Sequence, residues 1–428
     1  MAMNKQFIRS PIRLKLISAS FINAGGFIFS SLVVLFWSYL LVKLYPANDS
    51  GGLLLCLSCA GMVNLLDFGT SIGITRIISS ENSSLYSHHP RNYLLSAVIV
   101  SLLTEGMAVL LIIYFWKKLA LPSLPYYGYF SLLILTLSSQ VVLICVGFFK
   151  GLLNYRAANL VSAGTAIVVY GAGTVFLLAE SSVWIVFFIM ALMQVICAGA
   201  SVIYVLGSYS LMEVSNKISF NQLVRVVYPN LFKTSIKLFP QMFAGIFFLH
   251  VQRLIIARYA GLELVAIFSL AYSIATRLHG VVNAFLEIIF PMAQRLRAQG
   301  INVLIFCLKL GGIFTVVYFL IASVVIAIVV TVLPHILKPL IAYSIGVMFA
   351  VAAIPSFHFL NGVGRAFQIS FASLMSPIIY CILAFSIYSI NINYDNNLIL
   401  PLVYIFTMFI LFIWTFLLLY KYDHNKYI

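Results

Sequence analysis

Residues 303–330 read VLIFCLKLGGIFTVVYFLIASVVIAIVV, an apolar run in which Lys309 is the only charged side chain. A helix rises about 1.5 Å per residue, so about 20 consecutive apolar residues span the hydrocarbon core of a bilayer. A run of this length and composition therefore predicts a transmembrane helix.

The composition of the whole chain extends this prediction. Of 428 residues, 63% are hydrophobic and only 8% are charged, and the mean hydropathy is +1.09. Soluble domains average about 45–50% apolar and about 25% charged residues. These values exclude a soluble enzyme, a transcription factor and a disordered scaffold. They predict an all-α polytopic membrane protein.

Eleven further apolar runs bring the predicted number of transmembrane helices to about twelve. The predicted spans are 16–44, 53–78, 93–115, 127–149, 157–179, 183–206, 236–257, 263–290, 303–330, 340–361, 366–390 and 398–420. The first run is too long for the apolar part of a signal peptide, and no small-x-small cleavage pattern follows it. We therefore expect it to be a span that starts on the cytoplasmic side.

The placement of basic residues predicts that both termini are cytoplasmic. The chain has 25 Lys and Arg against 10 Asp and Glu, a net charge of +15. With the N-terminus inside, three basic residues fall within spans and only five fall outside, namely Lys43, Lys117, Lys118, Arg258 and Lys338. Cytoplasmic loops of membrane proteins collect Lys and Arg. This asymmetry explains most of the positive charge, so we expect no nucleic-acid partner.

A polar linker divides the predicted spans into two sets of six. We expect an N-terminal half at 1–206, a cytoplasmic linker at 207–235 and a C-terminal half at 236–428. Apolar residues spaced through 220–227 predict a short amphipathic helix in the linker, lying on the inner membrane surface. Pro229 is expected to end that helix.

Two short matches indicate that the halves are duplicates. Ser71–Arg76 (SIGITR) resembles Ser273–Arg277 (SIATR), and Arg76 and Arg277 are 201 positions apart. The segments FKGLLN at 149–154 and LNGVGR at 360–365 resemble one another at a separation of 211 positions. Six spans per half predict a parallel repeat around a central cavity that opens alternately to either side.

Ionisable residues at membrane depth are the candidates for function. An ionised side chain at mid-bilayer costs at least about 2.5–3.5 kcal/mol, which selects for a role or for a partner. For the substrate cavity we predict Arg277, Arg253, Arg76, Lys309 and Asp67. As coupling acids we consider Glu105, Asp67 and Glu287. The alternative for each residue is an internal ion pair with a purely structural role.

The eighth span, 263–290, carries polar or small residues at steps of three and four, which places them on one helix face. These residues are Ser269, Tyr272, Ser273, Thr276, Arg277, Gly280, Asn283 and Glu287. A tight helix–helix seam is one interpretation, because small and hydroxylated residues are common there. The side chain of Arg277 is too large for a simple seam, and burying its charge at membrane depth costs too much free energy. Its presence therefore indicates a cavity lining. The second span has a similar stripe of Gly61, Asn64, Asp67, Ser71 and Thr75.

Motifs for catalysis and cofactor binding are absent from the sequence. There is no GxxxxGK[ST] phosphate loop, no HExxH, no GxSxG and no kinase signature. The isolated histidines His250, His279 and His358 are not spaced as metal ligands. We therefore expect no enzyme activity and no bound cofactor, and we expect proton or sodium coupling in place of ATP hydrolysis.

The chain resembles polysaccharide-repeat flippases of the Wzx type, members of the multidrug/oligosaccharidyl-lipid/polysaccharide (MOP) exporter superfamily. The resemblance rests on loose motifs in a fixed order over nearly the whole chain. They are LDFG at 66–69 before Arg76, GFFKGLLNYRAAN at 147–159, RLII at 253–256, YAG at 259–261, Tyr272–Arg277 and NGVGR at 361–365. Relatives often carry an acidic residue where this chain has Gln252, and lipid II flippases of the superfamily have fourteen spans.

The resemblance implies a multi-pass protein of the bacterial inner membrane. Its substrate would be an undecaprenyl-diphosphate-linked oligosaccharide, such as an O-antigen repeat of lipopolysaccharide, moved from the cytoplasmic to the periplasmic leaflet. Besides the lipid-linked oligosaccharide and membrane lipids, a polysaccharide polymerase and a chain-length regulator are the partners it implies.

Two other function classes stay open. An ion-coupled exporter of organic cations, similar to multidrug and toxic compound extrusion proteins, requires a buried carboxylate such as Asp67 or Glu105. A membrane polymerase of lipid-linked sugars has similar length and hydrophobicity. Such polymerases typically have a large outer loop with arginines, and no predicted outer loop of this chain is of that size.

Overall fold

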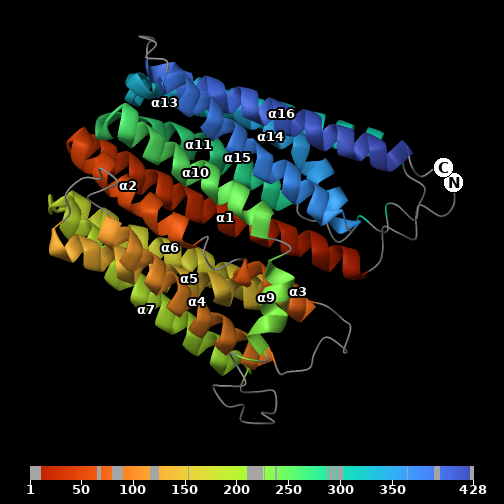
Figure 1. Ribbon diagram of the computed structural model, residues 1–428, viewed down its shortest axis with the longest axis horizontal. Helices are drawn as coiled ribbons and strands as arrows, with labels where there is room; N and C mark the ends of the chain where they lie inside the picture. Colours follow the sequence, from red (N-terminus) through yellow and green to blue (C-terminus); the bar gives the residue numbers. More distant parts are fainter. Residues whose placement is uncertain are drawn as a thin grey trace. The chain divides into compact units, whose positions relative to one another are not determined.

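The structure, a computed structural model, is helical throughout the residues that it describes (Figure 1). These are residues 11–64, 69–79, 90–115, 125–152, 154–209, 225, 227–236, 239–286, 289, 293, 296, 302–363, 365–389 and 396–424. Within these ranges there is no β-strand, so the predicted all-α polytopic fold is confirmed.

The chain divides into two compact units. Unit 1 consists of Met1–Ser31 and Ala271–Ile428, and unit 2 consists of Leu32–Leu270. Helices α1 (Pro11–Leu44) and α11 (Leu262–Leu286) each contribute to both units. The predicted boundary at the 207–235 linker stays a prediction.

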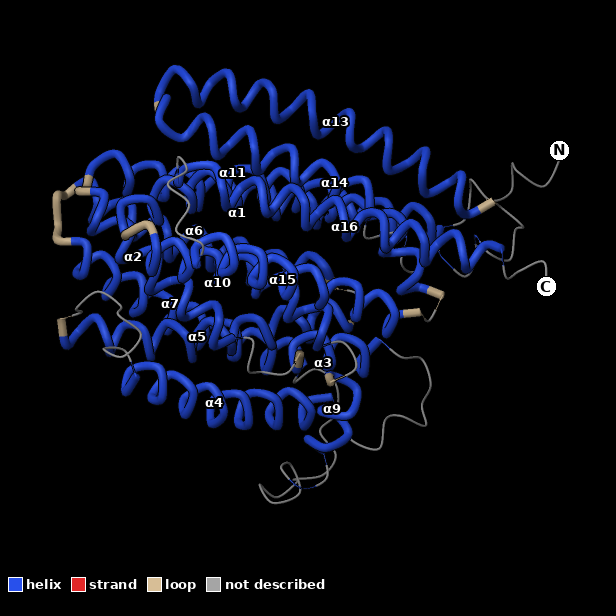
Figure 2. The backbone as a smooth tube through the Cα atoms, turned by 45° about the horizontal axis from the view of Figure 1, so that its top comes forward, coloured by secondary structure: helices blue, strands red, loops and turns tan. Residues whose placement is uncertain are grey.

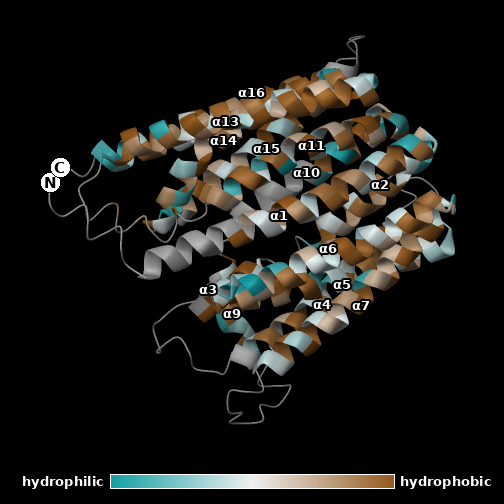
Figure 3. Ribbon diagram, turned by 180° about the vertical axis from the view of Figure 1, so that it is seen from behind, coloured by the Kyte–Doolittle hydropathy of each residue, from teal (hydrophilic) through white to brown (hydrophobic). Residues whose placement is uncertain are grey.

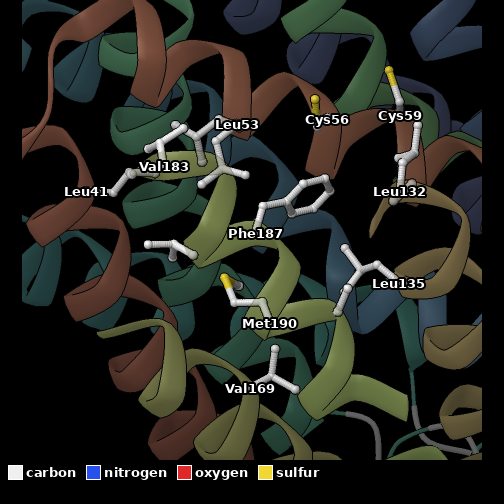
Figure 4. Close-up of a cluster of buried hydrophobic side chains, with 14 of the residues drawn as sticks. Leu41, Leu53, Cys56, Cys59, Leu132, Leu135, Val169, Val183, Phe187 and Met190 are labelled. Carbon is white, nitrogen blue, oxygen red and sulfur yellow. The ribbon is translucent and has the colours of Figure 1, made fainter. Parts of the chain in front are cut away.

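Unit 2 is built around α5. Its helices, besides parts of α1 and α11, are α2 (Ala47–Val63), α3 (Thr70–Ser79), α4 (Pro90–Phe115), α5 (Tyr126–Gly151), α6 (Tyr155–Leu178), α7 (Val183–Tyr209), α9 (Tyr228–Ser235) and α10 (Phe239–Tyr259). Helix α5 contacts α2, α3, α4, α6 and α7, and α10 packs along α2. Figure 4 shows a buried cluster of this unit, where Leu41, Leu53, Leu132 and Phe187 meet from α1, α2, α5 and α7.

Unit 1 is built around α14. Its helices, besides parts of α1 and α11, are α13 (Val303–Val332), the short 3₁₀ helix η5 (Pro334–Ile336), α14 (Leu337–Gly362), α15 (Ala366–Ser389) and α16 (Asn396–His424). Helices α13 and α14 form an antiparallel hairpin through η5 (Figure 2), and α14 also packs against α15 and α16. Apolar residues run along most of α13 and α16 (Figure 3). Only 11% of the span in α13 is buried, as suits a helix that faces lipid.

Local sequence explains where the helices begin and turn. Pro46 and Pro125 directly precede α2 and α5, where proline supplies the fixed backbone angle of a helix start. The side chains of Asn154 and Asn302 accept hydrogen bonds from the first turns of α6 and α13. Gly261 adopts φ +88°, a left-handed conformation that glycine tolerates, and it turns the chain between α10 and α11.

The helices reproduce eleven of the twelve predicted spans as single helices. Ten described helical segments are long and apolar enough to cross a membrane. Helix α10 corresponds to the predicted span 236–257, and α2 and α3 together correspond to 53–78. The N-terminal end of α1 and the C-terminal end of α16 lie on the same side of unit 1 (Figure 1), as expected for termini on one side of a membrane.

The second predicted span is not one continuous helix, and this corrects the stripe predicted along it. Helix α2 ends at Val63 and α3 begins at Thr70, after Gly69 with φ +79°. A residue at positive φ does not continue an α-helix. Gly61 and Asn64 therefore do not share a helix face with Ser71 and Thr75.

The linker helix also differs from expectation where it is described. Pro229 lies in the first turn of α9 and does not end a helix. Val227 and Leu231 are buried in a cluster with Ile74, Ile78 and Tyr93, so the apolar face of α9 packs on α3 and α4. Packing against protein removes these apolar side chains from water, just as insertion into a membrane surface would. Residues 220–224 and 226 of the predicted amphipathic helix lie outside the described residues.

The predicted repeat has a structural counterpart in two helix pairs. Helices α5 and α14 each have 26 residues and α6 and α15 each have 24, and both ends of each helix are separated by 211 positions. The turns after α5 and α14 close with the same backbone bonds. Leu152 N–H donates to Phe148 and Asn154 N–H to Phe149, while Val363 N–H donates to Phe359 and Arg365 N–H to Leu360.

Candidate functional site

Arg253 lies in the contact between α10 and α2 in unit 2. Its side chain is 9% exposed, and Nη1 donates a 2.8 Å hydrogen bond to the hydroxyl of Ser58. The neighbouring Gln252, which replaces the acidic residue of many relatives, is also buried. A buried guanidinium is costly unless its donors are satisfied, so this bond fixes Arg253 on α2.

Small residues of α2 allow α10 and α11 to approach it closely. A Cβ atom added to Gly61 would overlap the imidazole of His250, and one added to Gly51 would overlap the backbone of Leu262. With Ser58–Arg253, these contacts form an antiparallel series along α2. The sequence did not reveal this seam, because its partners are nearly 200 positions apart and each is an isolated small or polar residue.

Glu105 is fully buried in α4, at the level where Gly106 faces Leu137 of α5. Helix α5 carries several polar residues nearby along its length. Gln140 is fully buried, and Ser139 shares a hydrogen-bonded pair with Asn64 at the end of α2, with 3.0 Å between Asn64 Nδ2 and Ser139 Oγ. Unit 2 therefore contains an ionisable carboxyl group in a partly polar interior.

Part of the polar stripe of α11 packs against other helices of unit 1. Tyr272 forms edge-to-face contacts with Tyr343 of α14 and Tyr404 of α16, with ring centroids 5.2 and 5.5 Å apart. A Cβ atom on Gly280 would overlap the ring of Phe27 in α1. For these two positions the helix–helix seam is the correct interpretation. Arg277 of the same helix is only half-buried.

A second polar contact joins α11 to α14. His358 Nε2 lies 3.1 Å from Asn283 Oδ1, which accepts a hydrogen bond when that nitrogen is protonated. His279 lies one turn before Asn283 in α11. The fold thus brings His358 to Asn283, although the two residues are 75 positions apart in the sequence.

The remaining predicted site residues are described in part or not at all. Lys309 is exposed on α13. Arg76 lies in α3, where only its backbone is described, and Asp67 and Glu287 lie outside the described residues. The structure thus assigns Arg253 and Glu105 to unit 2, and Arg277 and Lys309 to unit 1. In the part of the chain with described side chains, no three His, Cys, Asp or Glu residues gather as metal ligands.

Comparison with solved structures identifies the fold as that of MOP superfamily transporters. An inward-facing multidrug resistance MATE family transporter of this superfamily matches with a TM-score of 0.68 and 11% identity, over 95% of this chain and 98% of that one. A MOP superfamily transporter from Pyrococcus furiosus, described as having a binding pocket of reverse polarity, matches with a TM-score of 0.61 and 13% identity, over 98% and 97%. The eukaryotic MATE transporter AtDTX14 gives 0.64 and 10%, over 96% and 98%.

The family follows from the sequence profile. Residues 20–297, from α1 through α11, match the family described as polysaccharide biosynthesis protein. The chain belongs to this family. No individual curated protein matches it significantly. Family and fold together confirm the resemblance to Wzx-type flippases and define a multi-pass membrane transporter.

Proposed function

We propose that this chain is a flippase that moves an undecaprenyl-diphosphate-linked oligosaccharide from the cytoplasmic to the periplasmic leaflet of a bacterial inner membrane. The family match over residues 20–297, on a transporter fold, carries this proposal. An O-antigen repeat for lipopolysaccharide is the substrate we put first. A polysaccharide polymerase and a chain-length regulator are the partners that would use the product.

The chemistry of such a substrate explains why a protein is needed. A diphosphate and a string of sugars lose their hydration in hydrocarbon and do not cross it unaided. The polyprenyl tail is apolar and stays in the bilayer. A transporter therefore has to give the head group a path with hydrogen-bond partners and compensating positive charge.

Arg277 is the residue we propose for the diphosphate. It lies on α11 at membrane depth, is half-buried, and presents a guanidinium that matches phosphate oxygens in a bidentate manner. Arg76, Lys309 and Asp67 stay candidates for the substrate cavity from the sequence. Arg253, predicted for the same role, is buried and bonded to Ser58, so we assign it to holding α10 on α2.

We expect an ion gradient, with no cofactor, to energise transport. Of the three candidate coupling acids, Glu105 is the one whose side chain is described, and its full burial in α4 makes its protonation state sensitive to the conformation around it. Asp67 and Glu287 stay candidates from the sequence.

Deletion of the gene tests the proposed function directly. Surface polysaccharide and the leaflet distribution of lipid-linked repeat units are measured in the same strain. A flippase predicts loss of surface polymer, with complete repeat units trapped in the inner leaflet. Unchanged surface polymer and unchanged lipid-linked repeats would contradict it.

Replacement of Arg277 tests the proposed site. Loss of a charge-assisted contact of about 1.5–3 kcal/mol predicts that Arg277→Ala slows export by about 10- to 100-fold while the protein remains in the membrane. Arg258→Ala, at the exposed end of α10, is the matched control and should export normally. A fully active Arg277→Ala strain would remove Arg277 from the site.

An ion-coupled exporter of organic cations is the second candidate, favoured by the structural likeness to MATE transporters. For such an exporter, Glu105→Gln should abolish transport and Arg277→Ala should matter less. A flippase predicts the opposite order. A membrane polymerase has less support as the function of this chain. Such enzymes typically have a large outer loop, and the longest segment between helices on the predicted outer side runs only from residue 116 to 125.

A further inference from the structure

Buried tyrosines hold one turn of α11 in the interior of unit 1. Tyr272 of α11, Tyr343 of α14 and Tyr404 of α16 form edge-to-face pairs, with ring centroids 5.2, 5.4 and 5.5 Å apart. A fourth tyrosine, Tyr318 of α13, donates a 3.3 Å hydrogen bond from its hydroxyl to the backbone carbonyl of Ala275 in α11. None of these four tyrosine side chains is more than 7% exposed. Helices α13, α14 and α16 therefore all hold α11 within a single turn.

The other copy of the repeat fills the equivalent place with leucine. Leu132 and Leu135 of α5 lie 211 positions before Tyr343 and Gly346 of α14, and both leucines are buried. In α14, a Cβ atom on Gly346 would overlap the ring of Tyr404, so the glycine makes room for that ring. Filling this part of the core does not require tyrosine. Since a buried phenol hydroxyl also needs a hydrogen-bond partner, the tyrosines indicate a role beyond packing.

The tyrosine contacts set the rotation of α11 about its own axis. At about 100° per residue, Arg277 lies about 140° around the helix from Tyr272 and about 160° from Ala275. The side of α11 that the tyrosines hold is therefore turned away from Arg277, whose side chain is half-buried. Because a rotation of α11 would turn Arg277 through the same angle, the contacts that fix the rotation also fix the direction of the guanidinium.

We propose that Tyr318 and Tyr272 are positioning residues for Arg277, and that they hold α11 at the rotation in which the guanidinium meets the diphosphate of the lipid-linked oligosaccharide. This inference rests on the proposed function. A bidentate contact between guanidinium and phosphate depends on direction as well as distance. A binding group whose supporting side chains are locked by packing keeps that geometry before the substrate arrives. All of these tyrosine contacts lie within unit 1.

Flipping in liposomes tests the role of Tyr318 in transport. The probe is the lipid-linked oligosaccharide fraction extracted from the deletion strain, and each rate is divided by the amount of folded protein. Tyr318→Phe keeps the ring and removes only the hydroxyl, so it should fold as the wild type does. We expect it to flip the probe about 2- to 10-fold more slowly, the factor that corresponds to one hydrogen bond. Tyr380→Phe, an equally buried tyrosine of α15, is the matched control and should flip at the wild-type rate.

A double variant separates positioning from stability. If Tyr318 acts through Arg277, Tyr318→Phe should have no further effect on flipping when it is combined with Arg277→Ala. A hydroxyl that only stabilises the fold would slow both backgrounds by the same factor and would lower the unfolding temperature. Equal slowing in both backgrounds, or flipping by Tyr318→Phe at the wild-type rate, would overturn the proposal.

A thiol at position 277 reports the orientation without any substrate. Arg277→Cys is introduced into the full chain and treated with a small, water-soluble thiol reagent, and mass spectrometry separates labelling at position 277 from labelling of the six native cysteines. We expect Tyr318→Phe and Tyr272→Leu to change the labelling rate at position 277, and Tyr380→Phe to leave it unchanged. The same rate in all of these variants would overturn the proposal.

The two proposals fail in different ways. No flipping of the probe by the wild type would contradict the proposed function, while the labelling rates would still decide whether the tyrosines orient position 277. Flipping by the wild type, together with an unchanged rate in Tyr318→Phe, would overturn the positioning role and leave the flippase intact.

Discussion

The helix pair α5–α6 in unit 2 and the pair α14–α15 in unit 1 have the same lengths, the same closing turn and a constant separation of 211 positions. At equivalent positions, Gly147 of α5 corresponds to His358 of α14. A Cβ atom on Gly147 would overlap the carbonyl oxygen of Ser71 in α3, whereas the ring of His358 reaches Asn283 of α11.

This difference shows which features of a duplicated element are kept and which change. The backbone turn is kept, because its hydrogen bonds close the end of one helix and start the next. The side chain at the contact changes, since glycine lets α5 approach the backbone of α3, whereas the ring of His358 hydrogen-bonds Asn283 of α11. The repeat thus supplies the framework, and single substitutions in one copy supply the chemistry.

Replacement of Gly147 is expected to have the largest effect. In Gly147→Val the branched side chain meets backbone that cannot move without shifting α3, and Thr75 also loses the geometry of its 2.8 Å bond to the Gly147 carbonyl. Overpacking in a core typically costs about 1–3 kcal/mol, and contact with backbone puts this variant at or above the upper end. Thermal unfolding and the amount of folded protein in the membrane measure the loss.

Two further variants test whether the loss of stability is specific to the contact at Gly147. Gly164→Val, in α6, meets open space and should fold normally. His358→Ala, at the equivalent position of the other copy, should lose only about 1–3 kcal/mol for its hydrogen bond and buried ring. Equal stability of Gly147→Val and Gly164→Val would contradict the close contact of α3 and α5.

Replacement of Arg253, a buried charge in the contact between α10 and α2, is expected to have the next largest effect. Arg253→Ala removes the bond to Ser58 and is expected to cost about 1.5–3 kcal/mol, the usual range for a hydrogen bond to a charged group. Arg253→Met keeps the length of the side chain and separates the loss of charge from the loss of packing. Unfolding temperatures of both variants in detergent test the seam, and unchanged values would place the guanidinium elsewhere.

Most of the fold could be predicted from the sequence, because hydropathy is a strong signal in a membrane chain. Eleven spans and the repeat at 211 positions follow from apolar runs and from the FKGLLN and LNGVGR segments. The break in the second span could not be predicted, since apolar residues continue through it and only Gly69 marks the turn. The packing of α9 on α3 and α4 could not be predicted for a similar reason. An apolar helix face is expected whether lipid or protein covers it.

The candidate site could be predicted only in its residue types. Arg253, Arg277 and Glu105 were identified because ionisable groups are rare at membrane depth. The contacts between helices could not be predicted. Ser58, the partner of Arg253, is one of many serines, and Asn283, the partner of His358, is 75 positions away from it. Pairing across helices depends on rotation and register, to which hydropathy is insensitive.

A reciprocal exchange between the copies should have a smaller effect. Asn154 caps α6 through its side chain, with 3.1 Å between Ala157 N and Asn154 Oδ1, and Arg365 holds the equivalent position before α15. Asn154→Arg should cost about 0.5–2 kcal/mol for the lost cap, and Arg365→Asn should gain part of that amount. Thermal shifts of opposite sign would support equivalence of the two turns, whereas losses in both variants would show that Arg365 has a role that asparagine does not replace.

Tyr45 is expected to give the smallest effect, and the effect should depend on pH. Its hydroxyl, in the turn after α1, donates to the carbonyls of Leu177 and Ser181 at the end of α6. Burial raises the pKa of Tyr45 above its usual value, and the carboxylate of Glu180 adds to this. The folded state therefore favours the neutral phenol, so its contribution is complete below the unfolded value of about 10 and declines as the pH rises above it. Tyr45→Phe should cost about 1 kcal/mol near neutral pH, and the difference from wild type should shrink in unfolding experiments above about pH 10. Tyr126→Phe, an exposed tyrosine at the start of α5, is the control, and a constant difference across this range would mean that the phenol of Tyr45 makes no such bonds.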